Sequence, residues 1–253
     1  MRYMGSKSRV AKHIVPIIQK IIDSKNIKVY VEPFCGGCNI IDKVHCDVKI
    51  ACDKSNYLIE LLKNRDKVKT LPDFISKDYY SEVRNAFNNQ TEIYPDWIIG
   101  AIGFLASYNG RFFDGGYGAT ITRKSTGKTY NAYLEAKNNL LAQNLAGIEF
   151  YCCDYSTIPF VKDALIYCDP PYFGVKQYGI SKGFNHSDFW KWVREQSKNN
   201  IVITSEETAP SDFTSIWKKE VQRSIKSDEK WDKTENLWVY EDLLDSLLKN
   251  DII

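Results

Sequence analysis

Apolar positions follow two alternating patterns over the first 56 residues and again from about residue 146. Residues 8–22 place valine and isoleucine at helical spacing, which predicts a basic amphipathic helix. Short, continuous apolar runs, typical of strands buried on both faces, lie at 28–31, 48–52, 148–153, 164–168 and 200–204. Strands of this kind separated by helical segments predict an α/β fold with a mostly parallel sheet.

The C-terminal part of the chain shows a different pattern. After an expected helix at 189–196, residues 220–225 and 237–240 are expected to form an antiparallel pair of strands. The apolar residues from 240 to 248 then return to helical spacing. We therefore expect a final helix that packs on the core.

Residues 57–145 interrupt the alternation and are predicted to form an inserted helical domain. Helices are expected at 97–107 and 131–145. Between them, residues 108–118 are rich in glycine and aromatic side chains, and 119–123 is predicted to pair with the residues before it as a β-ribbon. Basic residues in this stretch suit a flexible finger, spanning 108–128, that enters a DNA groove.

Two predicted strand ends carry residues that suit a nucleoside ligand. The first strand ends in Glu32-Pro33-Phe34-Cys35-Gly36-Gly37, where glycines let backbone N–H groups approach a ligand. The second ends in Asp53, at the position where a ribose diol would lie. The alternative is that Asp53 only caps the next helix. The dinucleotide pattern GxGxxG is absent.

A third strand end, Asp169-Pro170-Pro171-Tyr172, suits chemistry on a nucleobase amine. The amine lone pair is delocalised into the ring, so two acceptors that hold both N–H bonds would localise it. The Asp169 carboxylate and the Pro170 carbonyl can do this, because consecutive prolines stiffen the backbone. Tyr172 would stack on a base taken out of its helix. The alternative is a proline turn capped by Asp169.

Composition and charge narrow the class of protein. The chain of 253 residues suits one large α/β domain, or one domain with an insertion. It contains no apolar run near the ~18 residues of a membrane span and no signal peptide, so we expect a cytoplasmic protein. Seven cysteines predict reduced thiols, and Cys35 and Cys38 lack further ligands for a metal.

Basic residues concentrate in two segments. Residues 1–28 hold seven lysines and arginines against Asp23 alone, and 110–130 hold four against Asp114 alone. Two separated basic segments fit a polyanionic partner.

Five motifs in register resemble the Dam-type family of adenine-specific (N6) DNA methyltransferases. They are Arg2-Tyr3-Met4-Gly5-Ser6-Lys7, Glu32 to Gly37, Asp53, Asp154 and Asp169-Pro170-Pro171-Tyr172. The resemblance implies a Rossmann-like, seven-stranded, mostly parallel sheet of the class I S-adenosylmethionine-dependent methyltransferases. It further implies a catalytic, cofactor-binding domain formed by 1–56 and 146–253, and a DNA target-recognition domain formed by 57–145.

The resemblance also implies the site residues. The catalytic residues would be Asp169, Pro170, Pro171 and Tyr172. Those binding S-adenosylmethionine would be Tyr3, Lys7, Glu32, Pro33, Phe34, Gly36, Gly37, Asp53, Asp154, Tyr155 and Asp169. Those binding DNA would be Arg2, Tyr108, Asn109, Arg111, Arg123 and Lys124, and no metal is required.

The expected reaction transfers a methyl group from S-adenosylmethionine to the exocyclic amino group of a flipped adenine in double-stranded DNA. The sequence departs from GATC-specific members after Tyr108-Asn109-Gly110, where it continues with Arg111-Phe112-Phe113, so the target sequence stays open. Arg111 is a candidate to read a guanine. A cognate restriction endonuclease is a possible partner, and a monomer or weak dimer in a bacterial or phage-infected cell is expected.

Three alternatives remain. The same chemistry can serve cytosine amines, RNA bases or glutamine side chains. A non-catalytic DNA-binding protein on a methyltransferase scaffold would not require Glu32, Asp53, Asp169 and Tyr172. A dinucleotide oxidoreductase is disfavoured by the missing GxGxxG, and no acidic cluster suggests a nuclease.

Overall fold

The protein is described from a computed structural model covering residues 1, 3–122, 126–173, 183–222 and 232–248. Its main feature is a seven-stranded sheet with the order β5-β2-β1-β6-β7-β9-β8. The strands are β1 (Val29–Glu32), β2 (Val48–Asp53), β5 (Ile148–Cys152), β6 (Leu165–Cys168), β7 (Ile201–Glu206), β8 (Phe213–Gln222) and β9 (Asp232–Tyr240). The expected seven-stranded α/β architecture is confirmed.

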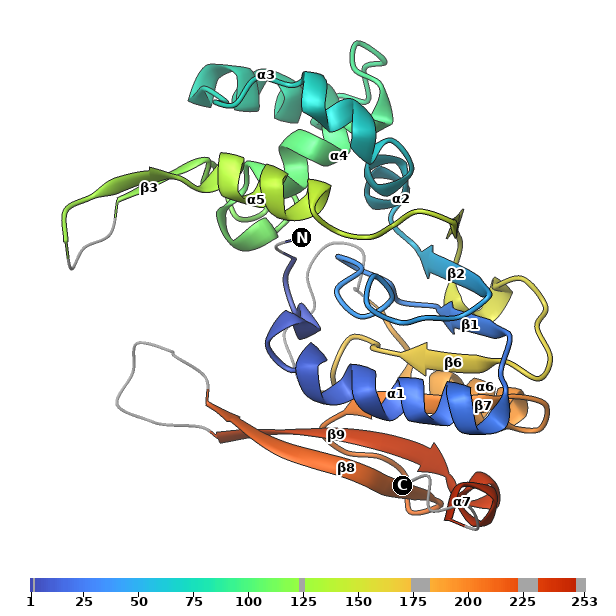
Figure 1. Ribbon diagram of the computed structural model, residues 1–253. Helices are drawn as coiled ribbons and strands as arrows, with labels where there is room; N and C mark the ends of the chain where they lie inside the picture. The colour runs from blue at the N-terminus through green and yellow to red at the C-terminus, as the bar shows by residue number, and fades with distance from the viewer. Residues whose placement is uncertain (2, 123–125, 174–182, 223–231, 249–253) are drawn as a thin grey trace.

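The sheet is mostly parallel. β5, β2, β1, β6 and β7 run in one direction, and β9 is antiparallel to both β7 and β8. The carboxyl ends of β1, β2 and β6 therefore lie at one edge of the sheet (Figure 1). Ligands of open α/β sheets bind at this edge.

Helices cover both faces of the sheet. On one face, α1 (Ala11–Lys25) packs Ile14 and Ile18 into a cluster with Tyr30 of β1 and Tyr167 of β6. On the other, α6 (His186–Ser197) packs Phe189 into a cluster that includes Val31 and Ile166. Neighbouring residues of one strand thus pack on opposite faces of the sheet, as the strand period of two requires. α7 (Glu241–Leu248) follows β9 and confirms the expected final helix.

A second group of elements lies beyond the β2 and β5 side of the sheet (Figure 1). It contains α2 (Asn56–Lys63), α3 (Lys77–Asn88), α4 (Asp96–Leu105) and α5 (Ala132–Leu141), with a ribbon of β3 (Thr120–Thr122) and β4 (Thr129–Asn131). Short 3-10 turns occur at Lys7–Arg9, Arg65–Thr70, Tyr108–Gly110 and Tyr155–Thr157. The helical content expected for 57–145 is present, and its role as a target-recognition domain stays a prediction.

The structure corrects two expectations for this region. The ribbon strand β3 pairs with β4, which follows it, rather than with the residues before it. Residues 108–118 do not project as a finger, because Phe113 is buried and Phe112 packs on Phe87 and Phe104. Aromatic burial outweighs the glycine content, and the ribbon β3–β4 is the part that projects (Figure 1).

The antiparallel pair is also longer than expected, since β8 begins at Phe213 and β9 at Asp232. The polar and basic residues in these strands hide the strand pattern in the sequence. Among the described residues, no helix has the length and apolar character needed to cross a membrane.

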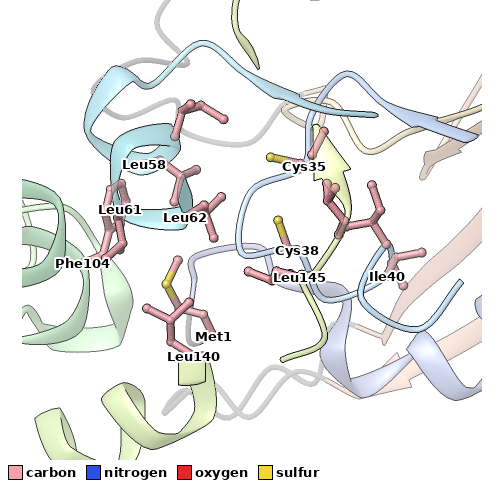
Figure 2. Close-up of a cluster of buried hydrophobic side chains, with 14 of the residues drawn as sticks. Met1, Cys35, Cys38, Ile40, Leu58, Leu61, Leu62, Phe104, Leu140 and Leu145 are labelled. Carbon is pink, nitrogen blue, oxygen red and sulfur yellow. The ribbon is translucent and has the colours of Figure 1, made fainter. Parts of the chain in front are cut away.

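Cys35 and Cys38 are core residues. Figure 2 shows both on the loop after β1, with their side chains among apolar side chains of the N-terminus, α2, α4, α5 and the segment before β5. Cys38 is fully buried, and the hydrogen bond between the Cys35 thiol and Cys38, together with burial, raises the pKa of Cys35 well above the ordinary value. Both residues behave as small apolar side chains, which agrees with the packing explanation of their spacing.

Candidate active site

A large cleft opens at the carboxyl ends of β1, β2 and β6. Its volume is about 1920 Å³. The walls come from the N-terminal segment, the loop after β1, residues 109–114, residues 153–155 and the end of β6. Sites for one small molecule are typically about 300 to 1,000 Å³, so this cleft has room for two ligand groups side by side.

Lys7 lies at the centre of a buried ionic cluster. Its ammonium is 2.8 Å from Asp169 Oδ1 and 2.9 Å from Glu235 Oε1. Burial by itself lowers the pKa of Lys7, but the two carboxylates outweigh burial and raise that pKa above its ordinary value. Lys7 therefore stays charged and holds the Asp169 carboxylate at the carboxyl end of β6.

The Tyr172 hydroxyl belongs to the same cluster. It contacts Ser205 Oγ at 3.1 Å, receives a hydrogen bond from Lys7 Nζ at 2.5 Å and donates one to Glu235 Oε1. Ser205 Oγ also donates to Glu235 Oε1, at 2.9 Å. Burial raises the pKa of Glu235, but Lys7, Tyr172 and Ser205 more than offset this effect and lower it overall. The cluster fixes the tyrosine ring from its hydroxyl end.

Glu32 ends β1 beside this cluster. Its side chain is 3 % exposed and its Oε1 accepts a hydrogen bond of 2.7 Å from the Tyr30 hydroxyl. Burial raises the pKa of Glu32 to about 8, and the nearby Asp169 adds to the shift. A carboxyl kept mostly neutral at pH 7 would ionise more readily beside a bound cation.

The loop after β1 is held against the end of β2. The Gly36 N–H donates to Asp53 Oδ2 at 3.2 Å, and the Ser55 N–H donates to Asp53 Oδ1 at 2.9 Å. Gly36 has a φ of +45°, and a Cβ there would lie 3.0 Å from the Tyr3 ring. Only glycine fits this position without displacing Tyr3. Burial raises the pKa of Asp53 to about 6 despite these hydrogen bonds.

Aromatic rings line the far end of the cleft. Phe34 stacks on Tyr155 with ring centroids 5.5 Å apart, and Phe184 and Phe189 surround the pair. Asp154 caps the adjoining turn by accepting from Ser156 N–H at 3.1 Å. Burial opposes ionisation of Asp154, but Ser156 and Lys54 lower its pKa overall. The result is an aromatic wall of the cleft with a charged rim, against which a flat heterocycle can pack.

A comparison of the sequence with models of protein families identifies a match. The model described as "D12 class N6 adenine-specific DNA methyltransferase" matches residues 3–231. The chain belongs to this family. It is an adenine-specific DNA methyltransferase, and the predicted Dam-type resemblance is confirmed.

Three relatives agree with this assignment. The chain is 25% identical over 237 residues to the DNA adenine methylase of Haemophilus influenzae, covering 82% of this chain and 79% of the relative. It is 22% identical over 213 residues to the Type II methyltransferase M.MjaIII of Methanocaldococcus jannaschii, covering 75% and 74%. It is 24% identical over 192 residues to the Type II methyltransferase M.FokI of Planomicrobium okeanokoites, covering 68% and 28%.

The fold brings the predicted catalytic and cofactor residues of the methyltransferase into one cleft. Residues from five separate parts of the chain line it: Tyr3, Lys7, Glu32, Pro33, Phe34, Gly36, Gly37, Asp53, Asp154, Tyr155, Asp169, Pro170, Pro171 and Tyr172. Their individual roles stay predictions.

The predicted DNA-binding residues divide into two groups. Asn109 and Arg111 line the cleft, and Tyr108 is 48% exposed beside them. Arg2, Arg123 and Lys124 lie outside the described residues.

Sequence reasoning missed Glu235 and Ser205. Glu235 has the same strand parity as Leu237 and Val239, both fully buried, so it lies on the covered face of β9. An acid at a core-facing position of a strand is the signal that identifies it, because buried acids need partners.

Proposed function

We propose that the methyltransferase transfers a methyl group from S-adenosylmethionine to the exocyclic amino group of an adenine flipped out of duplex DNA. The observation that supports this most is the convergence of Asp169-Pro170-Pro171-Tyr172 and the Glu32 to Gly37 loop on one cleft. Its volume of about 1920 Å³ suits a nucleoside cofactor and a base together.

The residues present fit S-adenosylmethionine. Asp53, at the end of β2, would accept hydrogen bonds from the ribose hydroxyls. Phe34 and Tyr155 would hold the cofactor adenine, with Asp154 at its edge. The acids Glu32 and Asp169 would favour a cationic sulfonium, and Tyr3 would close the loop over the methionine part. When bound, S-adenosylmethionine supplies an electrophilic methyl group to the site.

The chain's own residues prepare the amine for attack. The Asp169 carboxylate, held by the Lys7 ammonium, accepts one N–H of the adenine amino group. The Pro170 carbonyl accepts the other. Holding both N–H bonds in place localises the nitrogen lone pair and aims it, so catalysis is mainly positioning and electrostatic stabilisation.

Tyr172 would provide the stacking surface for the flipped base. Because Lys7, Ser205 and Glu235 hold its hydroxyl, the ring is fixed before the base arrives. A preorganised ring loses little conformational entropy on binding, which lowers the free-energy cost of capturing an unstacked base.

Residues 57–145 would act as the DNA target-recognition domain, with 1–56 and 146–253 as the catalytic domain. The ribbon β3–β4 would approach DNA together with Tyr108, Asn109 and Arg111. Arg2, Arg123 and Lys124 would add phosphate contacts. A cognate restriction endonuclease is consistent with the names of two relatives, and DNA substrate implies work in the cytoplasm.

The deciding experiment is expression in a methylation-deficient bacterial host, followed by single-molecule sequencing read for modified adenine and cytosine in every context. We expect N6-methyladenine in one short sequence. No modified base, from protein shown to be folded and to bind S-adenosylmethionine, would contradict DNA methylation and point to RNA or protein amines. A folded protein that does not bind the cofactor would contradict the proposed donor.

A further inference from the structure

A stripe of basic residues runs beside the cleft on the side away from the helical insertion. We define the basic stripe as Arg9, Lys12, His13 and Lys219. Arg9 lines the cleft, and both Arg9 and Lys12 are exposed. Residues 1–22 contain no aspartate or glutamate, so no acid from this segment neutralises the first turns of α1.

Lys219 brings positive charge from β8 to the same place. Its Nζ lies 2.5 Å from His13 Nε2, and the His13 ring stacks on Trp217 with centroids 6.1 Å apart. Burial lowers the pKa of His13, and the charges of Lys219 and Lys12 lower it further. A largely neutral His13 can accept a hydrogen bond from Lys219 Nζ, so the positive charge of the stripe comes from Arg9, Lys12 and Lys219, and an external anion would stabilise it.

The basic stripe is continuous with the active site. Lys219 is directly opposite Glu235 in the β8–β9 pair, and Glu235 contacts Lys7. After the irregularity at Ser215/Trp217, Trp217, Lys219 and Glu235 share one face of this pair. The basic stripe therefore adjoins the ionic cluster of the site at the pair Lys219 and Glu235.

The strand pair that carries Lys219 extends in the same direction as the projecting ribbon. In Figure 1 the ribbon β3–β4 and the pair β8–β9 extend toward the same side of the molecule, and the N-terminal segment lies between them. The carboxyl ends of β1, β2 and β6 point to that side as well. A duplex placed over the cleft would meet the ribbon on one side and the basic stripe on the other.

We propose that the basic stripe binds the phosphate backbone of the DNA on the side of the target base opposite the ribbon β3–β4. This surface rests on the proposed function, since it requires duplex DNA over the cleft. It is an electrostatic contact that positions the duplex without reading its sequence.

The test is the salt dependence of DNA binding by the Lys12→Gln/Lys219→Gln double variant, measured by fluorescence anisotropy with a short duplex. Each lost phosphate contact reduces the slope of log affinity against log salt by about 0.9, so we expect a reduction of about 1.8. The loss of DNA affinity should be the same for duplexes with and without the target sequence. The methylation rate at saturating DNA should be unchanged.

The matched control is Lys28→Gln/Lys198→Gln, which removes the same charge from exposed positions at the amino ends of β1 and β7. We expect this variant to keep the wild-type slope. An unchanged slope in the stripe variant, or an equal reduction in the control, would overturn the proposal. The Lys12→Gln single variant changes only an exposed side chain, so a reduced slope in this variant excludes misfolding as the cause.

This outcome is separable from the fate of the proposed function. A chain that methylates adenine in DNA but shows no change of slope on loss of the basic stripe would contradict only this inference. A chain that methylates no DNA would contradict the proposed function, whatever the slope.

Discussion

Glu235 Oε1 accepts a hydrogen bond from the Tyr172 hydroxyl, which joins the loop after β6 to a strand 63 positions further along the chain. Glu235→Gln keeps the shape of the side chain but removes the negative charge that pairs with Lys7, which leaves Asp169 as the other carboxylate in contact with the Lys7 ammonium. Loss of one charge-assisted contact is typically worth about 1.5 to 3 kcal/mol, so we expect a fall in kcat of roughly 10- to 100-fold. Single-turnover methylation, with the cofactor dissociation constant measured in parallel, checks this.

Two variants test whether Glu235 acts through Tyr172. Tyr172→Phe keeps the stacking ring and loses the hydroxyl, so its effect and that of Glu235→Gln should be less than additive in the double variant. Ser205→Ala removes only the neutral hydroxyl contact and should lower kcat less than Glu235→Gln does. Additive effects, or a lower melting temperature with unchanged kcat, would indicate a purely structural role for Glu235.

Asp169→Ala should abolish methylation and leave most of the DNA affinity. The carboxylate serves the reacting amine and not the phosphates, and removal of one preorganised electrostatic group typically costs about 100- to 1,000-fold in rate. Methylation assays with saturating cofactor and a DNA-binding assay on the same folded variant check this. An equal loss of DNA affinity would contradict the assignment.

Cofactor binding should weaken in acid because of Asp53. Its pKa in the free protein is raised to about 6, and ribose hydroxyls donate stronger hydrogen bonds to the ionised carboxylate than to the neutral acid. As pH falls through 6 the carboxylate protonates, so the affinity for S-adenosylmethionine should fall by up to about tenfold per pH unit. Titration calorimetry from pH 5 to 8 measures this dependence.

Asp53→Asn provides the control for that titration. It should bind the cofactor weakly at all pH values and lose the dependence around pH 6. Because the folded pKa exceeds the ordinary 3.8, the stability linked to Asp53 is full below 3.8 and is lost as pH rises through 6. The melting temperature of the unliganded variant should also lose this pH dependence, and a pH profile of cofactor binding unchanged from the wild type would argue against Asp53 as the ribose acceptor.

Arg111→Ala should change target recognition without weakening cofactor binding. Arg111 lines the cleft on the wall formed by residues 109–114, apart from Asp53. A bidentate arginine contact to guanine is typically worth about 1 to 3 kcal/mol of discrimination. Sequencing of DNA methylated by the variant should show relaxed or reduced specificity, whereas identical methylation in every context would show that Arg111 does not read the DNA.

Local patterns were enough to locate the parts of the site that sit at strand ends. Three of the continuous apolar runs lead directly into an acid that lines the cleft, namely Glu32, Asp53 and Asp169. A parallel sheet places these ends at one edge, so the grouping of the three acids follows from strand prediction alone. The Asp-Pro-Pro-Tyr and glycine-turn motifs can likewise be identified from a few consecutive residues.

Other features depend on contacts that no local pattern contains. Lys7 and Glu235 meet only because β9 inserts antiparallel between β7 and β8, which brings the two ends of the chain together. His13 and Lys219 meet for the same reason. Phe112 and Phe113 read as part of a projecting loop until the aromatic core around Phe87 and Phe104 is assembled.

The sequence by itself determined the fold class, the family and the acids at the strand ends, since these depend on periodicity and short motifs. The tertiary structure decided which distant side chains neutralise one another, because charges and aromatic rings interact through space without regard to their separation in the chain. Lys7 is the clearest case. Its sequence neighbours mark it as a site residue, and only the folded sheet shows that Asp169 and Glu235 share its charge.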